Sequence, residues 1–296
     1  MKIKTLLLNP YEILFIHGQS RQGVLLHITD EKGNIGTGDI APLPKWSKET
    51  LEEALIELEQ KKEEILKVEW EKEGSLEELR KLDLLPSVTF GLESALLSLL
   101  DPLLAHTVLK SALLMGSLEE ILEQASLRKK EGYLFAKLKV GNLSFKEAKE
   151  AIFHLKDVFR LRIDVNRAWE TEESLEFFTK FPLDAFDYVE EPFKNPHDLH
   201  LFAHPLAVDE SFPKDLSLVE IETFSALKAL IYKPTIQGGI MGCLPLLEWT
   251  RKRGIDLVLS SSFESEVGLS HIVSMAHRLS LKAPIGIGTC HFIERL

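Results

Sequence analysis

Short apolar runs alternate with longer amphipathic segments from residue 110 onward. This alternation is typical of parallel strands that are each followed by a helix. Eight runs are candidate strands, at 111–115, 134–139, 160–164, 186–190, 206–209, 229–233, 256–260 and 284–288. The segments between them include expected helices at 145–159, 172–180, 239–252 and 265–280. Eight strands at this spacing predict an α/β fold, a TIM-type (β/α)7β barrel over residues 106–296.

The first hundred residues have a different pattern, with strand-like runs followed by helices. A β-rich run at 24–29 and a polar turn at 30–34 predict a hairpin. Thr50, with Glu53 three residues later, has the pattern of a capping box at the start of a long helix. We therefore predict an α+β capping domain over residues 1–105, packed directly on the barrel because no low-complexity linker separates the two.

The composition disfavours several classes of protein. The chain has 46 acidic and 35 basic residues, a net charge of −11, so we expect no nucleic-acid partner. No apolar stretch approaches the roughly 20 residues of a membrane span, and Asn9, Pro10 and Glu12 interrupt the start before a signal-peptide core develops. We expect a cytoplasmic protein without a membrane segment. Two cysteines are too few for a disulfide framework.

Five of the predicted strands end in ionisable residues that hydrophobic patterning does not explain. The carboxyl ends of barrel strands face one mouth, where the chemistry of such proteins is done. A lone charge at a strand end is most often a cap or a surface residue, but five successive cases indicate a common site. The residues are Lys137 and Lys139, Asp164, Glu190, Asp209 and Lys233.

The three carboxylates of this set predict a metal site. Asp164, Glu190 and Asp209 would form a cluster of oxygen ligands, which selects Mg²⁺, with Mn²⁺ as the alternative. Without a cation, three like charges would be crowded together at a cost in folding energy. A bound metal would also reverse the local field of an acidic protein, so that a small-molecule carboxylate substrate can bind.

The lysines predict proton transfer. Lys137 and Lys139 lie two apart on a strand and therefore share a face. Burial, mutual repulsion and a nearby divalent ion would favour the neutral amine, which is a general base near pH 7. Lys233 ends a strand roughly across the barrel. The arrangement suits removal of a proton next to a carboxylate, with the metal stabilising the resulting enediolate.

The ordered series KLK, D-x-N, EEP, DES and KP resembles the enolase superfamily, specifically the muconate lactonizing enzyme subgroup, whose sites pair a base with Mg²⁺. The resemblance implies that Asp164, Glu190 and Asp209 are the metal ligands, and it selects Glu190 rather than Glu191. It further implies that Lys139 is the acid/base catalyst, Lys137 its tuning neighbour and Lys233 the lysine on the opposite face. Asn166 and Arg162 would support the first ligand or the substrate.

Four further segments resemble the o-succinylbenzoate synthase family, at 36–54, 86–97, 162–169 and 260–269. Asp39 departs from that pattern, which commonly has glutamate there. The resemblance implies Mg²⁺-dependent dehydration of 2-succinyl-6-hydroxy-2,4-cyclohexadiene-1-carboxylate to o-succinylbenzoate in menaquinone biosynthesis.

Two loops are candidates for contact with the substrate. Ser260, Ser261 and Ser262 follow the seventh strand, where hydroxyl and backbone N–H groups would bind the succinyl carboxylate, although a plain polar loop has the same composition. The segment from His17 to Gly23 is a candidate lid over the barrel mouth.

Two alternatives remain open at this stage. A dipeptide epimerase, an N-succinylamino acid racemase or a muconate cycloisomerase of the same superfamily would share most of the barrel. Epimerases of this type usually carry an Asp-x-Asp pair at the eighth strand, where this chain reads IGIGT. A non-catalytic barrel that acts as a binding protein predicts the loss of at least one of the charged residues, and none is missing.

Overall fold

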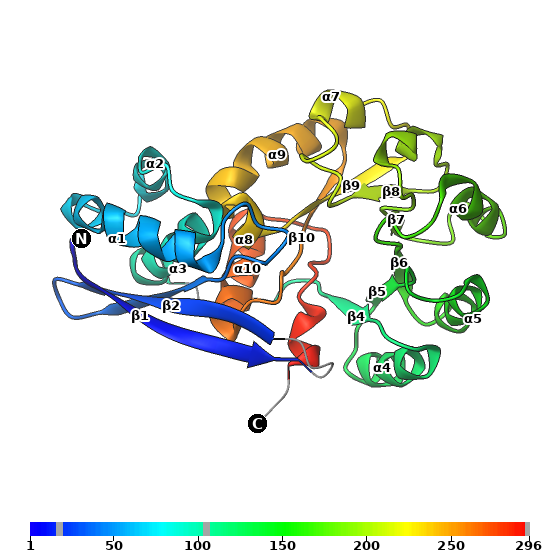
Figure 1. Cartoon of the computed structure of the whole chain (residues 1–296), viewed down its shortest axis with the longest axis horizontal. Coiled ribbons are helices and arrows are strands. Elements are labelled where there is room, and N and C mark those ends of the chain that lie inside the picture. Colours follow the sequence, from blue (N-terminus) through cyan, green and yellow to red (C-terminus); the bar gives the residue numbers. More distant parts are fainter. Residues whose placement is uncertain (16–19, 103–106, 294–296) are drawn as a thin grey trace.

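The computed structural model describes residues 1–15, 20–102 and 107–293, and Figure 1 shows two parts packed side by side. The smaller part contains an antiparallel sheet in the order β1-β2-β3, formed by β1 (Ile3–Leu14), β2 (Ser20–Asp30) and β3 (Ile35–Ile40). Three helices follow: α1 (Leu51–Lys67), α2 (Ser75–Lys81) and α3 (Pro86–Leu100). The predicted hairpin is confirmed as β2 and β3, whereas the long first strand was not predicted.

Local hydrogen bonds explain where these elements turn and begin. The Asp30 carboxylate accepts hydrogen bonds from the backbone N–H groups of Lys32 and Asn34, which fixes the turn between β2 and β3. The capping box at the start of α1 is confirmed, because Glu53 N–H donates to the Thr50 hydroxyl and Thr50 N–H donates back to the Glu53 carboxylate.

The larger part is a curled sheet of seven parallel strands surrounded by helices (Figure 1). Its strands are β4 (Ser111–Leu114), β5 (Phe135–Lys139), β6 (Arg160–Asp164), β7 (Tyr188–Glu190), β8 (Leu206–Val208), β9 (Leu227–Tyr232) and β10 (Asp256–Leu259). The helices are α4 (Leu118–Lys130), α5 (Phe145–Leu155), α6 (Thr171–Phe178), α7 (Leu218–Ile221), α8 (Pro234–Gln237), α9 (Gly239–Arg253) and α10 (Glu266–Arg278), with 3₁₀ turns at Pro196–Leu201 and Gly288–Phe292. The predicted barrel fold is confirmed, although several elements are a few residues shorter than expected.

The eighth predicted strand, 284–288, is reduced to two bridging residues. Ile285 accepts a hydrogen bond from Ser111 N–H at 2.9 Å, next to β4. Gly286 donates its N–H to Leu259 at the end of β10, at 2.8 Å. Bridges at both residues therefore link the two edge strands of the curled sheet and close the ring.

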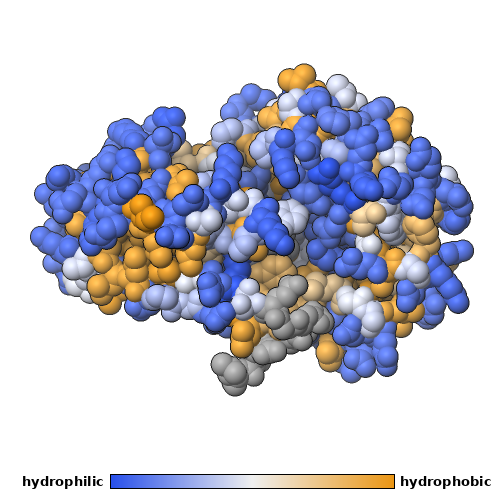
Figure 2. Space-filling model, in the orientation of Figure 1, coloured by the Kyte–Doolittle hydropathy of each residue, from blue (hydrophilic) through white to orange (hydrophobic). Residues whose placement is uncertain are grey.

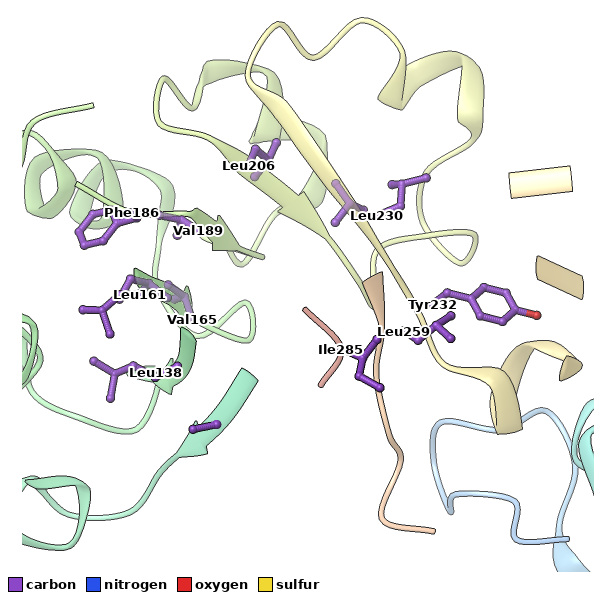
Figure 3. Close-up of a cluster of buried hydrophobic side chains, with 14 of the residues drawn as sticks. Leu138, Leu161, Val165, Phe186, Val189, Leu206, Leu230, Tyr232, Leu259 and Ile285 are labelled. Atoms are coloured by element: carbon purple, nitrogen blue, oxygen red, sulfur yellow. The ribbon is translucent and has the colours of Figure 1, made fainter. Parts of the chain in front are cut away.

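Side chains alternate between the two faces of each barrel strand, as the pleat requires. Figure 3 shows Leu138, Leu161 and Val189 on the outer face, and all three belong to the large core under the helices. Burying each such side chain contributes roughly 1.5–3 kcal/mol relative to leaving it exposed. The residues between them, such as Lys137 and Arg162, consequently face the inside of the barrel.

Buried polar contacts hold the smaller part against the barrel. Asp39 of β3 accepts hydrogen bonds from the hydroxyl and the N–H of Ser265, at the start of α10. Glu93 of α3 accepts from the N–H of Ile240 on α9 and lies 2.9 Å from the ring of His271 on α10. The aspartate that replaces the expected glutamate at position 39 therefore takes part in this contact.

The surface is mainly polar. Figure 2 shows hydrophilic side chains over most of the visible face, with hydrophobic ones gathered over the sheet of β1 and β2. Among the helices of the described part, none is long and apolar enough to cross a membrane. The expected domain boundary at residue 105 falls within 103–106, and part of the candidate lid falls within 16–19, so both lie outside the described residues.

Candidate active site

A cavity of about 270 Å³ opens at the carboxyl ends of the barrel strands. Leu43 and Trp46 of the smaller part complete its wall. Every site residue predicted from the sequence lines this cavity: Lys137, Lys139, Arg162, Asp164, Asn166, Glu190, Asp209, Lys233, Ser260, Ser261 and Ser262. The register of the strands explains why three of these residues lie together, because Lys139, Asp164 and Glu190 are neighbours across β5, β6 and β7.

Inside the barrel, the predicted carboxylates Glu190 and Asp209 belong to one cluster, and Asp164 lies beside it, joined to Glu190 through Lys137. Lys137 Nζ lies 2.9 Å from Asp164 Oδ2 and 2.7 Å from Glu190 Oε1, so one ammonium group joins two of them. Oxygen atoms of Glu190, Asp209 and Glu210 lie within 4.8 Å of one another. Glu210 was not predicted, because in a regular strand a residue next to Asp209 faces the opposite side. β8 ends at Val208, and the chain beyond it no longer alternates.

The donor set of this cluster fits a hard cation. Glu190 Oε2 and Glu210 Oε2 are buried and have no hydrogen-bond partner within the described residues. Burial raises the pKa of Glu190 well above its ordinary value. The positive charge of Lys137 lowers this pKa, whereas the negative charge of Asp164 raises it further. A bound divalent ion would compensate the negative charge of these buried carboxylate oxygens. Sites made only of oxygen ligands select Mg²⁺-like metals.

The lysines differ in their surroundings. Burial by itself lowers the pKa of Lys137, but the charges of Asp164, Glu190 and Asp209 outweigh it and hold that pKa well above the ordinary value. The sequence predicts the opposite direction for a site that holds a divalent ion. Beside these carboxylates, Lys137 is an ammonium group that bridges Asp164 and Glu190.

Lys139 and Lys233 face the cavity from different strands. Lys139 Nζ donates to Asn166 Oδ1 at 2.9 Å and lies 3.7 Å from Asp164 Oδ2. Lys233 forms an ion pair with Asp209, and its Nζ lies 4.7 Å from the centre of the Trp46 ring. The Lys139 side chain is 36% exposed and that of Lys233 is 15% exposed. Lys139 is therefore the more accessible of the two lysines to a bound molecule.

The two consecutive glutamates after β7 have separate roles. Glu191 has a positive φ of 45°, which turns its side chain away from the cavity. Its carboxylate accepts hydrogen bonds from the N–H groups of Asp209 and Ser211 and from the Ser211 hydroxyl. Burial raises the pKa of Glu191 to about 8. The structure thus places Glu190 in the cavity and uses Glu191 to fix the loop that carries Asp209.

Arg162 lies at the floor of the cavity and is already engaged by the protein. Its Nε donates to Asp187 at 2.8 Å and its Nη1 to the carbonyl oxygen of Pro284 at 2.6 Å. The guanidinium group also lies 4.8 Å from the centre of the Tyr188 ring. These contacts indicate that Arg162 supports the floor of the barrel through its Nε and Nη1 donors.

The serine loop after β10 contains a buried hydroxyl group, that of Ser262, without a partner among the described residues. Ser261 Oγ lies 2.8 Å from Thr289 Oγ1, and Ser262 N–H donates to Glu264 at 2.6 Å. Ser262 Oγ is buried without a hydrogen-bond partner among the described residues, so it is available to a ligand. Thr289 and Trp46 also line the cavity. No charge or motif marks Thr289 in the sequence, and Trp46, although it lies within the segment 36–54, was not predicted as a site residue.

Comparisons with protein families and solved structures agree with the fold. A family model described as MenC, N-terminal domain, matches residues 16–99, and one described as Enolase C-terminal domain-like matches residues 120–285, more than half of the chain. Two solved structures share the fold at a TM-score of 0.80 and cover the whole chain: a dipeptide epimerase from Methylococcus capsulatus complexed with Mg and the dipeptide L-Arg-D-Lys (19% identity, 93% of that chain) and MenC from Desulfotalea psychrophila LSv54 (18%, 96%). Barrel, capping sheet and convergent charges together define an enzyme of the enolase superfamily.

The sequences of curated relatives narrow the assignment from the superfamily to one family within it. The o-succinylbenzoate synthase of Edwardsiella ictaluri (strain 93-146) is 33% identical over 290 residues, covering 93% of this chain and 84% of the relative. That of Yersinia enterocolitica is 32% identical over 297 residues, with the same coverage. The chain belongs to the o-succinylbenzoate synthase family, a family of carbon–oxygen lyases within that superfamily.

Proposed function

We propose that this protein is an o-succinylbenzoate synthase that dehydrates 2-succinyl-6-hydroxy-2,4-cyclohexadiene-1-carboxylate in menaquinone biosynthesis. The observation that carries the proposal is the pair of lysines, Lys139 and Lys233, which face one cavity from different strands beside a buried carboxylate cluster. The membership of the chain in this family supports the choice of substrate.

In this proposal Lys139 moves the proton. Its neutral amine takes the proton next to the ring carboxylate, and the resulting ammonium group protonates the hydroxyl group that leaves as water. Asn166 holds the Lys139 amine in place. Lys233 remains an ammonium group and balances the negative charge that develops on the substrate. The product ring is aromatic, which makes the overall step favourable.

Asp164, Glu190 and Asp209 would hold one Mg²⁺, with Glu210 beside them and Mn²⁺ as an alternative ion. The bound ion supplies positive charge next to the substrate carboxylate. The orphaned oxygen atoms of Glu190 and Glu210 support this assignment. Ser262, through its unused hydroxyl group, would bind the succinyl carboxylate together with Ser260 and Ser261.

The eighth-strand segment argues against an epimerase. Gly286 and Gly288 are the parts of this segment that line the cavity, and they offer no carboxylate to a substrate amine. These two glycines form a small, uncharged part of the cavity lining. Such a lining is compatible with a substrate ring that carries carboxylates and no amine. An epimerase or racemase activity therefore has less support from the described residues than dehydration.

A turnover assay with the purified chain tests the proposal. Mg²⁺ and the cyclohexadiene acid should give the aromatic product, and EDTA should stop its formation. Lys139→Ala should lower kcat by roughly 10²- to 10⁴-fold, because it removes the general base and acid. Lys146→Ala, which changes an exposed lysine of α5, is the matched control and should stay close to wild type.

Binding and substrate panels complete the test. Calorimetry with Mg²⁺ should show that Lys139→Ala still binds the ion, so that the loss is chemical. Dipeptides and N-succinylamino acids should react poorly or not at all. Full activity of the Lys139 variant, full activity in EDTA, or faster turnover of a dipeptide would each contradict the proposed function.

A further inference from the structure

A second cavity lies beside the catalytic cavity, between the smaller part and the barrel. It encloses about 820 Å³, which is within the size range of small-molecule sites. Trp46, Asp209 and Lys233 line both cavities. The two cavities are therefore adjacent, and the contact between Trp46 and Lys233 lies where they meet.

The remaining lining of this second cavity is strongly basic. Lys45 and Lys48 come from the loop before α1, and Arg167 and Lys214 come from loops that follow β6 and β8. Among the described residues, its acidic lining consists of Asp209 and Glu210, both in the carboxylate cluster assigned to the cation. The cavity is thus a locally positive region of a chain whose net charge is −11.

Three of these basic side chains have no carboxylate partner. Arg167 is paired with Asp215 at 2.5 Å. In the part of the chain that the structure describes, no ion pair joins Lys45, Lys48 or Lys214 to an acidic residue, and all three are exposed. These three lysines therefore add unpaired positive charge to the lining of the cavity, and a lining of one sign concentrates the field.

We propose that the second cavity is a transit site for small dicarboxylates. Lys45, Lys48 and Lys214 attract the anionic substrate, which then passes into the catalytic cavity beside Trp46. The inference rests on the proposed function, which supplies a substrate with two carboxylates. Exposed ion pairs are individually weak, so the site captures the dianion and also releases it. It governs how often substrate reaches the catalytic cavity.

Charge-removing variants of the full chain test the transit site. Lys45→Gln combined with Lys214→Gln removes two charges and keeps side chains that can form hydrogen bonds. Lys129→Gln combined with Lys130→Gln is the matched control, because these exposed lysines at the far end of α4 line neither cavity. Steady-state kinetics are measured at about 0.01 M and about 1 M ionic strength, where the Debye length is about 30 Å and about 3 Å.

We expect the cavity variant to lose about 10-fold in kcat/KM at low ionic strength and the control to stay close to wild type. The difference should close at high ionic strength, where the field is screened. Equal kcat/KM for the two variants at low salt, or a loss that persists at high salt, would overturn the transit site alone. A wild-type protein that does not convert the cyclohexadiene acid would instead overturn the proposed function and, with it, this inference.

Discussion

At the scale of single residues, the contact between Trp46 and Lys233 joins the two parts of the molecule at the cavity. The ring belongs to the loop before α1, whereas the amine follows β9. The Nζ atom lies 4.7 Å from the ring centre, within the range of a cation–π interaction. Because Asp209 holds the same amine, the ring and the carboxylate together fix where the positive charge lies.

Replacing Trp46 with leucine should therefore lower kcat. A partly exposed cation–π contact contributes roughly 0.5–2 kcal/mol, which corresponds to a loss of about 2- to 30-fold. Trp46→Phe keeps an aromatic face and should retain most of the activity. Measurement of kcat and KM for both variants checks this, and an equal loss in both, or no loss in either, would contradict a role for the ring.

The sequence revealed the charged residues of the cavity together with Asn166 and the serine loop, but not Trp46 or Thr289. An ionisable residue at the end of an apolar run is conspicuous, so Lys139 and Asp164 were predicted. Trp46 and Thr289 were not, because their types are common in loops and cores. The raised pKa of Lys137 follows from its distances to Asp164, Glu190 and Asp209, which the sequence does not contain.

At the scale of elements, four helices around the barrel, α4, α5, α7 and α10, begin at a serine side-chain cap. Ser144 at the start of α5 accepts a hydrogen bond from Glu147 N–H, and the Glu147 carboxylate accepts one from Ser144 N–H. Ser117 and Glu120 form the same capping box at α4. Each cap stabilises donors that the helix itself leaves unpaired.

Removing one of these caps should cost stability without removing the helix. Ser144→Ala should lower the free energy of unfolding by about 1 kcal/mol, because the first-turn N–H groups lose an acceptor. Ser144→Asn, which can still cap, is the control and should lose only part of that amount. Urea denaturation followed by circular dichroism measures both, and identical midpoints for wild type and Ser144→Ala would contradict the prediction.

Periodicity predicted the barrel elements better than their lengths. The strands were located because apolar runs between amphipathic helices are distinctive, and β6 was predicted with its observed bounds, 160–164. The ends of other elements differ because hydrogen bonding, not hydrophobicity, decides them. The eighth strand is the clearest case: the run at 284–288 is apolar, yet only Ile285 and Gly286 form bridges.

At the scale of the whole molecule, Glu93 connects three helices across the two parts. It lies on α3, is fully buried, accepts from Ile240 N–H on α9 and lies against the ring of His271 on α10. No pattern in the sequence indicates this contact, because the partners of Glu93 are 147 and 178 residues away.

Loss of this carboxylate should destabilise the native protein as a whole. Glu93→Ala leaves buried polar partners without an acceptor and should cost about 3 kcal/mol of unfolding free energy. Glu93→Gln retains one acceptor oxygen and should cost less. Chemical denaturation provides the measurement. A Glu93→Ala protein as stable as wild type would show that the contact does not hold the parts together.

The two-residue closure of the barrel has a consequence for how the protein is made. A ribosome produces the chain from its amino-terminal end, so β4 and β10 both emerge before Ile285 and Gly286, which bridge them. Until that moment the nascent sheet has two open edges, which are prone to wrong pairing. The ring therefore stays incomplete from the synthesis of β4 until Ile285 and Gly286 emerge.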